Sequence, residues 1–464
     1  MMISMQNTYS PIDGSLYVER PYADDEQISA ALDKAKTAQV LWKKLHLSER
    51  KIICTRAVEA FVANKDQIAE ELCWQMGRPI RYAAGEIDSF SERSKYMILA
   101  ADEALEPVQI REKDGFTRYI NREPIGVVLV IAPWNFPVHT PINAIIPALL
   151  AGNAVILKHS SQTPLCAERI FEAFRSAGIP DGVFQYLHMS HQDTETIIQA
   201  SEINAVAFTG SVSAGIKVET AAAGRFISVG LELGGKDPAY VRKDADLEHA
   251  VASTLDGAFF NSGQSCCGIE RIYVHEAIYD EYVDEFVKLA KQYDLGRPDD
   301  QHTTLGPLVR ASAADFVRGQ IDEALEQGAV AHINSSDFAM DKKGTPYLAP
   351  QVLTNVDHSM RVMKEESFGP VVGIMRVASD EEALWLMNDS EFGLTASIFT
   401  NEIDEAVALG EQLETGTFFV NRCDYLDPEL AWTGVKNTGR GCTLSKFGFD
   451  AFTRLKSFHI KTII

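Results

Sequence analysis

Two cysteines stand side by side in the stretch FFNSGQSCCG, residues 259–268, directly after a Gly-Gln pair. A cysteine thiolate is a strong nucleophile, so Cys266 or Cys267 could attack an electrophilic carbon and form a covalent intermediate. A buried thiol, in contrast, behaves as a small apolar side chain and does no chemistry. The stretch alone leaves both interpretations open, because a reactive thiol needs an accessible and electropositive site.

A second chemical signal lies at Thr209-Gly210-Ser211, where an apolar run ends and a helix is expected to start. The free N–H groups and positive dipole end of a helix start favour a phosphate, although Ser211 could equally be a simple N-cap. The segment 210–217, GSVSAGIK, has the glycine spacing of a P-loop, but Ile216 occupies the place of its lysine. The GxGxxG fingerprint of dinucleotide-binding folds is absent after the expected strands.

Composition and charge exclude several other functions. The 464 residues carry a formal net charge of −22, which disfavours nucleic acid and an anionic membrane surface as partners. The seven cysteines form no CxxC pair, so neither a disulfide framework nor a metal site is expected. No secretory signal is visible, and prolines interrupt the most apolar stretch, residues 126–157. We therefore expect a cytoplasmic protein of two or three domains.

The elements that must position these residues alternate in type along the chain. Periodic apolar residues predict helices over residues 48–71 and 82–105, and the alternating segment around Asp114-Gly115 predicts a polar hairpin. Short β-branched runs and helical stretches then alternate, which is typical of a doubly wound parallel sheet. Ligands bind such sheets beyond the carboxyl ends of the strands. Those ends are expected at Pro133-Trp134, Lys158 and Thr209-Gly210.

Seven motifs follow one another in the order typical of one enzyme superfamily. They are PWNFP (133–137), GNAVILK (152–158), FTGS (208–211), LELGGKDP (231–238), GQSC (263–266), EESFGPVV (365–372) and NDSEFGLTASIFT (388–400). From about Ser10 onward the chain resembles the NAD(P)-dependent aldehyde dehydrogenases, which oxidise aldehydes to acids. The resemblance implies an α/β fold with a doubly wound parallel cofactor-binding sheet, a second α/β catalytic domain and a small β oligomerisation element.

This resemblance divides the chain into three parts. The NAD(P)-binding domain is expected over residues 1–107 and 124–232, and the catalytic domain over residues 233–425. The hairpin 108–123 and the C-terminal arm 426–464, whose tail HIKTII looks like a strand, are expected to serve oligomerisation. Because the hairpin is polar and uncovered, we expect it to meet another subunit of a homodimer or homotetramer.

The resemblance also distinguishes between the two cysteines. The nucleophile of the family lies two places after the glutamine of the Gly-Gln pair, which is Cys266, and Cys267 is expected to pack. Attack on an aldehyde gives a thiohemiacetal, whose oxyanion the family stabilises with the amide of Asn135 and the N–H of Cys266. Hydride transfer to NAD or NADP leaves a thioester. Glu232, which alone could be a mere cap, matches the base that activates the hydrolytic water.

The cofactor residues follow from the same motifs. Lys158 matches the lysine that holds the adenosine ribose, and Glu366 the glutamate that holds the nicotinamide ribose. The other residues expected at the cofactor are Trp134, Ser160, Ser161, Gly210, Ser211, Gly215, Leu233 and Phe368. NAD-preferring members commonly carry a glutamate three residues after the lysine, where this chain has Ser161. Without that carboxylate a 2′-phosphate meets no repulsion, so NADP is expected alone or beside NAD.

Other functions stay open. Succinate semialdehyde dehydrogenases commonly place an arginine eight residues after the PWNFP asparagine, where this chain has Asn143, although Arg422 could substitute. A CoA-acylating enzyme would not need Glu232, and a cysteine hydrolase would need a histidine that these motifs lack. A non-catalytic binding protein would be expected to have lost the active set. The segment 421–448 departs from the family pattern, so the aldehyde stays unassigned.

Overall fold

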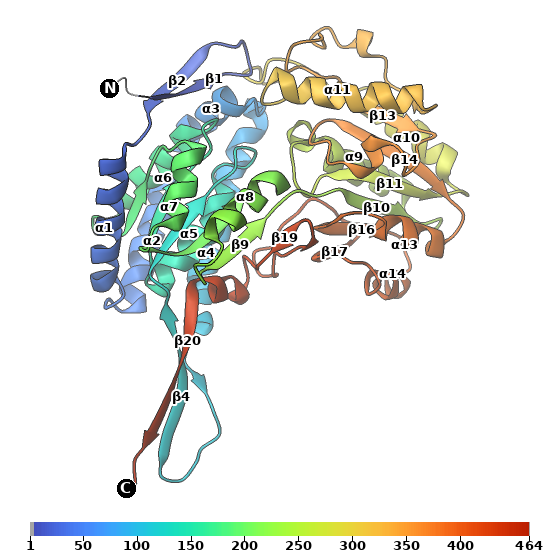
Figure 1. The fold of residues 1–464 in the computed structure, drawn as a ribbon. Coiled ribbons are helices and arrows are strands. Elements are labelled where there is room, and N and C mark those ends of the chain that lie inside the picture. The colour runs from blue at the N-terminus through green and yellow to red at the C-terminus, as the bar shows by residue number, and fades with distance from the viewer. Residues whose placement is uncertain (1–3, 464) are drawn as a thin grey trace.

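The computed structural model describes residues 4–463 as two sheets of mainly parallel strands, flanked by helices, with a narrow arm projecting from the body (Figure 1). The first sheet has six strands in the order β19-β9-β8-β5-β6-β7. Its strands are β5 (Val127–Ile131), β6 (Ala154–Lys158), β7 (Phe184–Tyr186), β8 (Ile203–Thr209), β9 (Ser228–Glu232) and β19 (Gly439–Arg440). Only β19 runs antiparallel to its neighbour, β9.

The strand order of the first sheet reverses at β5, which pairs with β6 on one side and with β8 on the other. This arrangement confirms the doubly wound sheet. Each residue of β5 and β6 is buried, because helices cover both faces, and this explains the continuous runs VVLVI and AVILK. The helices between the strands are α5 (His139–Ala151), α6 (Pro164–Ser176), α7 (His191–Gln199) and α8 (Val212–Ala222). The carboxyl ends of β5 and β8 form the switch point where ligands bind.

Four helices precede this sheet, after a short hairpin of β1 (Met5–Tyr9) and β2 (Leu16–Pro21). They are α1 (Asp25–Trp42), α2 (Leu47–Val62), α3 (Lys65–Met76) and α4 (Ile80–Ala104). The single helix expected over residues 48–71 is wrong, because α2 ends at Val62 and α3 begins at Lys65. Asn64 lies at the break, and its side chain donates to the Ala60 carbonyl at 3.0 Å, in competition with continued helix.

The second sheet has seven strands in the order β12-β13-β14-β11-β10-β16-β17. They are β10 (Asp237–Val241), β11 (Ile269–His275), β12 (Val330–Ala331), β13 (Gln351–Thr354), β14 (Val371–Val377), β16 (Thr395–Phe399) and β17 (Thr417–Val420). The accompanying helices are α9 (Leu247–Phe259), α10 (Tyr279–Ala290), α11 (Ala311–Glu326), α12 (Arg361–Lys364), α13 (Asp380–Asn388) and α14 (Ile403–Gly410). Another strand pair, β15 (Phe392–Gly393) with β18 (Val435–Lys436), lies outside both sheets.

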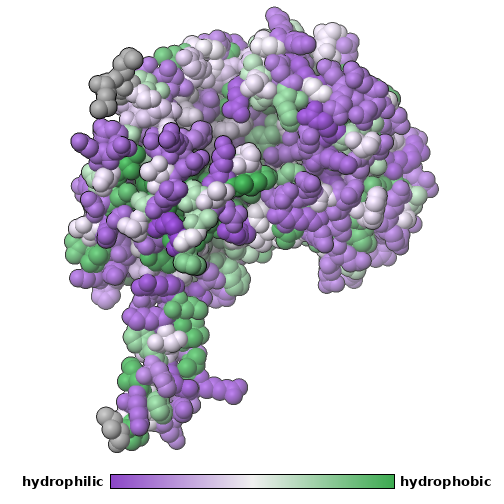
Figure 2. Space-filling model, in the orientation of Figure 1, coloured by the Kyte–Doolittle hydropathy of each residue, from purple (hydrophilic) through white to green (hydrophobic). Residues whose placement is uncertain are grey.

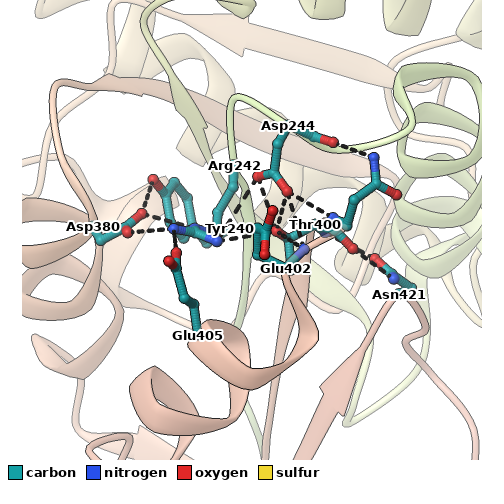
Figure 3. A network of polar contacts seen from close by, with 9 residues as sticks. Tyr240, Arg242, Asp244, Asp380, Thr400, Glu402, Glu405 and Asn421 are labelled. Carbon is teal, nitrogen blue, oxygen red and sulfur yellow. Dashed lines mark hydrogen bonds and ion pairs between the residues drawn. The ribbon is translucent and has the colours of Figure 1, made fainter.

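Arg242 fastens one end of this second sheet (Figure 3). Directly after β10, its guanidinium donates to Asp380 at the start of α13, at 2.8 Å, and also pairs with Glu405 of α14. It reaches the Thr400 hydroxyl after β16 at 3.1 Å, and that hydroxyl donates to Asp244 at 2.7 Å. One buried arginine therefore joins the ends of two neighbouring strands to two helices.

The arm is a three-stranded sheet of β3 (Val108–Gln109), β4 (Phe116–Pro124) and β20 (Thr453–Lys461). The hairpin turns at Gly115, whose φ is 78°, as the Asp-Gly pair predicts. Its first strand is shorter than expected, with two residues paired to β4. β20 pairs along all of β4, from Thr453 with Pro124 to Lys461 with Phe116, which confirms that the tail is a strand and shows that it pairs with the hairpin of its own chain.

Two further observations concern the described part of the chain. None of its helices combines the length and the apolar character that crossing a membrane requires. Within residues 4–463, histidine, cysteine, aspartate and glutamate side chains form no group of three or more that could hold a metal ion.

We predict that the arm mediates association into at least a dimer. Its apolar side chains are exposed, with Leu455 at 65% and Ile460 at 45%, and Figure 2 shows apolar surface on the arm between polar residues. Light scattering at micromolar concentration should give a mass of at least two chains, and Leu455→Asp should lower it. Trp385→Asp on α13, where the side chain is 66% exposed, is the matched control. A monomeric mass for the unmodified protein would contradict the prediction.

Candidate active site

One cavity of about 3520 Å³, counted to its open mouth, extends from the carboxyl ends of β5, β6 and β8 to the loops beside the second sheet. Within the described residues, it is lined by all the residues expected at the site except Gly215. Gly215 lies buried on α8, where a Cβ atom would come within 2.6 Å of the Leu233 side chain. This glycine therefore allows α8 to approach Leu233, and it does not face the cavity.

The loop that carries the two cysteines has an unusual backbone. Asn261, Ser262 and Gly263 all have positive φ, at 53°, 57° and 71°. Such a run is costly for residues with a Cβ atom and persists only where its surroundings fix it. The Ser262 hydroxyl donates to the Gly306 carbonyl at 2.8 Å, and the Gln264 side chain accepts from the Val309 N–H at 2.8 Å. These contacts hold the loop so that Cys266 borders the cavity.

The two cysteines differ in their surroundings. Cys266 is partly exposed, whereas Cys267 is buried at 3% exposure and belongs to the hydrophobic core. The Cys267 thiol donates to Asp424 at 3.0 Å, and the Ser265 hydroxyl donates to the same carboxyl at 3.0 Å. Burial raises the pKa of Asp424 to about 7, although both donors lower it. Asp424 thus connects the loop of the two cysteines to the segment that begins at residue 421 and departs from the family pattern.

Asn135, beyond the end of β5, lies against the same loop. Its Nδ2 donates to the Gln264 carbonyl at 3.2 Å, two residues before Cys266. The Asn135 carbonyl in turn accepts from Arg78 Nη2 at 2.6 Å and from Asn261 Nδ2 at 3.2 Å. The Asn135 amide is therefore held beside the loop of Cys266, where it can donate to an oxyanion formed at that thiol.

Arg78 supplies the counter-charge for a buried carboxylate. Its Nη1 pairs with Glu86 on α4, and both side chains are at most 2% exposed. Glu86 also accepts from the Val138 N–H at the start of α5, at 2.8 Å. The Arg78 Nε donates to the Asn261 side chain at 3.2 Å. One guanidinium thus links α4, the Asn135 loop and the cysteine loop.

Glu232 ends β9 and is held by two hydroxyl groups. Thr209 Oγ1, at the end of β8, donates to it at 2.9 Å, and Thr443 Oγ1 donates at 2.5 Å. Thr443 is brought here because β19 pairs with β9 next to Glu232. Burial raises the pKa of Glu232, and the two donors oppose this rise. A buried carboxylate with a raised pKa is suited to accept a proton from water near neutral pH.

The cofactor end of the cavity lies at the switch point of the first sheet. Lys158 ends β6 and is buried, which lowers its pKa to about 8. Ser160 and Ser161 follow it and line the same cavity. Gly210 and Ser211 precede α8, and the Ser211 hydroxyl accepts from the Ala214 N–H at 3.3 Å. A buried cation and a helix start therefore face this end of the cavity. Such an end suits the phosphates of a dinucleotide.

Another wall of the cavity is built around Glu366. The Gly235 N–H donates to Glu366 at 2.9 Å, and a Cβ atom on Gly234 would lie 2.6 Å from its carboxyl oxygen. Burial, and next the charge of Glu270, raise the pKa of Glu366 to about 8. Phe368 meets the Trp134 ring edge to face at 5.6 Å between ring centres. This wall offers the Glu366 carboxylate as a hydrogen-bond acceptor, beside the two aromatic rings. An acceptor for ribose hydroxyls next to aromatic rings fits the nicotinamide half of the cofactor.

Several residues of the site carried no recognised sequence signal. Arg78 and Glu86 stand outside every motif, and their role depends on contacts with segments that are distant in the chain. Thr443 and Asp424 lie in the segment 421–448, which departs from the family pattern. The departure is visible in the sequence, but it does not indicate which residues of the segment reach the site. Arg422, expected as a possible substrate cation, is exposed, and its guanidinium lies 3.6 Å over the Tyr425 ring.

Comparisons with known proteins agree with this geometry. The aldehyde dehydrogenase family matches residues 3–458 of the chain. The succinate semialdehyde dehydrogenase [NAD(P)+] Sad of Escherichia coli K12 is 34% identical over 97% of this chain and 96% of its own length. The succinate-semialdehyde dehydrogenase [NADP(+)] of Deinococcus radiodurans is 32% identical over 97% of this chain and 93% of its own length.

Solved structures give the same result. The succinic semialdehyde dehydrogenase from Streptococcus pyogenes, in complex with NADP+, is 30% identical with a TM-score of 0.93, covering 98% of this chain and 100% of that chain. Gox0499 is 33% identical with a TM-score of 0.94, covering 99% of this chain and 100% of that chain.

Proposed function

Since the chain belongs to the aldehyde dehydrogenase family, we propose that its substrate is succinate semialdehyde and that it uses NADP+ comparably with NAD+. The chain is an NAD(P)-dependent enzyme that oxidises an aldehyde to a carboxylic acid, as its motifs predicted. The observation that carries the proposal is that Cys266, Asn135 and Glu232 line one cavity together with Lys158 and the residues that precede α8. The names of the full-length relatives support the choice of aldehyde.

The first step belongs to the cysteine loop. The Cys266 thiolate attacks the aldehyde carbon, and the carbonyl oxygen becomes the oxyanion of a thiohemiacetal. The Asn135 amide and the Cys266 backbone N–H donate to that oxyanion. Because Arg78 and Asn261 already fix the Asn135 loop, little reorganisation is needed when charge develops on the oxygen.

The cofactor supplies the hydride acceptor when it is bound. Lys158 and the start of α8 bind its adenosine and diphosphate part, while Glu366 and Phe368 position the nicotinamide half beside Cys266. Lys217 and His191 also line the cavity. Burial and the charges of Lys158 and Lys217 lower the pKa of His191, so the positive charge of Lys217 and the ring nitrogens of His191 favour a 2′-phosphate. These residues therefore support NADP use together with Ser161.

Glu232 completes the cycle. After hydride transfer the acyl group is a thioester on Cys266, and Glu232 takes a proton from the water that attacks its carbonyl carbon. The C–S bond then breaks, the acid leaves, and Cys266 recovers its thiolate form. Thr209 and Thr443 orient the carboxylate for this step.

The roles of the two cysteines can be separated. Cys266→Ala should abolish dehydrogenase and esterase activity, because no nucleophile is left, whereas Cys267→Ala should keep at least about a tenth of the rate. Steady-state kinetics and a melting curve for each variant are the measurements. Equal loss in both variants, with both folded, would exclude the assignment of Cys266.

The protonation of Glu232 should determine the acidic limb of the pH–rate profile. Glu232 acts while deprotonated, so the steady rate falls as the pH drops through its raised pKa. Thr443→Val removes a donor that favours the charged form, so the acidic limb should move to higher pH and the rate at pH 6 should fall at least about threefold. Thr443→Ser is the control that keeps the hydroxyl. Glu232→Gln should give a burst of reduced cofactor followed by a stall.

A missing burst in Glu232→Gln would instead assign this residue to an earlier step, such as activation of the thiol. An unchanged acidic limb in Thr443→Val would show that Thr443 does not act on the base.

Substrate and cofactor are tested together by measuring kcat/KM for succinate semialdehyde, D-glyceraldehyde and butanal with each cofactor. A relative 31% identical over 97% of this chain is named D-glyceraldehyde dehydrogenase (NADP(+)), so that aldehyde is the sharpest competitor. Succinate semialdehyde should exceed both others by about tenfold or more. NADP+ should lie within about tenfold of NAD+, or above it, because one bond to a charged phosphate is worth about that factor.

Ser161→Glu should depress NADP+ use and spare NAD+, and Ser161→Ala is its uncharged control. A faster reaction with D-glyceraldehyde would reject the proposed substrate. Rejection of NADP+ by about a hundredfold in the unmodified enzyme would show that the barrier lies outside Ser161.

A further inference from the structure

Among the residues that the structure describes, seven lysine and arginine side chains are buried, and most of them have polar partners within the protein. Five of the seven buried lysine and arginine side chains make ion pairs or hydrogen bonds, and they are Arg50, Arg78, Lys236, Arg242 and Arg271. The other two, Lys158 and Arg93, make neither within the part of the chain that the structure describes. Both line the main cavity. A buried charge without a partner is costly, so such a group points to a ligand that neutralises it.

Lys158 is accounted for, because it lies at the cofactor end of the cavity. Arg93 lies elsewhere, on α4 and only 5% exposed, and its Nε is enclosed without a partner among residues 4–463. Burial lowers the pKa of Arg93, and the carboxylates of Glu232 and Glu86 oppose this fall. Arg93 therefore lies close to Glu232, with which it lines the cavity.

The carboxylates around Arg93 have other partners. Glu86 is paired with Arg78, and Glu232 accepts hydrogen bonds from two threonines. Glu92, its neighbour on α4, is exposed, and the Tyr425 hydroxyl lies 3.5 Å from its carboxylate. None of these three carboxylates comes within ion-pair distance of the Arg93 guanidinium.

Two side chains of the neighbouring helix α5 are in the same condition. His139 Nδ1 and Asn143 Oδ1 are enclosed and have no partner within the described residues, and both residues line the cavity. Burial and the charge of Arg93 hold the pKa of His139 well below its usual range, so this ring is neutral. The cavity wall formed by α4 and α5 thus carries a guanidinium, a neutral imidazole and an amide. Each has an atom without a hydrogen-bond partner among the described residues, and a polar ligand could supply one.

We propose that Arg93 binds the carboxylate of the substrate at the end remote from its aldehyde group, and so selects short aldehydes that carry a second, ionised acid group. A planar guanidinium can hold a carboxylate through two parallel hydrogen bonds. Removal of both charges from water inside the cavity strengthens their attraction. This inference rests on the proposed function, since it explains how succinate semialdehyde is distinguished from an uncharged aldehyde of equal length.

The test compares two aldehydes of the same length, succinate semialdehyde and butanal, with the same cofactor. Arg93→Met keeps most of the side-chain length without charge. It should lower kcat/KM for succinate semialdehyde at least about 30-fold and change kcat/KM for butanal by less than about threefold. Arg93→Lys should recover part of the loss, because it restores the charge but not the two-pronged geometry. Arg422→Met, which removes an exposed arginine outside the cavity, should leave both values unchanged.

A binding measurement on the same variants needs no catalysis. Succinate should raise the melting temperature of the unmodified enzyme and leave that of Arg93→Met unmoved, while Arg93→Met without ligand should melt at the same or a higher temperature. That result also shows that the variant is folded. An equal loss of kcat/KM for both aldehydes, together with a shifted acidic limb of the pH profile, would overturn the proposal. Arg93 would then act on the protonation of Glu232 and not on the substrate.

The outcomes separate this inference from the proposed function. If the unmodified enzyme prefers succinate semialdehyde and Arg93→Met keeps that preference, the inference is wrong and the proposed substrate stands. If the unmodified enzyme shows no such preference, but succinate or glutarate still protects it only when Arg93 is present, the proposed substrate is wrong. In that case Arg93 still binds a carboxylate, which belongs to a different aldehyde.

Discussion

The buried guanidinium of Arg78 is the contact on which the rest of the catalytic geometry depends. It reaches the Glu86 carboxylate on α4, the Asn135 carbonyl after β5 and the Asn261 side chain in the cysteine loop. Loss of one partner of such a buried pair costs about 3–5 kcal/mol, because the other charge stays uncompensated. Asn135 and Cys266, the proposed oxyanion donor and nucleophile, follow strands of different sheets or precede them, so this arginine helps to fix their separation. Stability and catalytic geometry therefore rest on the same side chain.

Burial around the cavity drives ionisable groups toward their neutral forms. The pKa of Glu366 rises to about 8 and that of Asp424 to about 7, while that of Lys158 falls to about 8. A site with these groups changes its charge within the physiological pH range, although the surface of the chain is strongly acidic. The binding of a charged ligand in this cavity is therefore linked to the protonation of these groups.

Much of this arrangement could be predicted from the sequence, because its causes are local. The β-branched runs of β5, β6 and β8 predict buried parallel strands. Because parallel strands end at the same edge of a sheet, the residues that follow these strands must lie together. The motif that contains Cys266 also predicted that this residue is the nucleophile, and the structure places Cys266 at the cavity. Arg78, Arg93 and Thr443 could not be found in this way, since each acts through residues far away in the chain. The break between α2 and α3 was missed because the helical periodicity continues through Asn64.

The contact between Thr443 and Glu232 has a consequence for how the protein matures during its synthesis. The two residues are separated by 211 positions, and β19 must pair with β9 before their side chains can meet. At translation rates of about 5–20 residues per second, the ribosome needs roughly 10–40 s to make that stretch. Until then β9 has a free edge and Glu232 lacks one of its donors. A nascent chain that already contains Cys266 and Glu232 therefore still lacks the Thr443 hydroxyl that donates to Glu232.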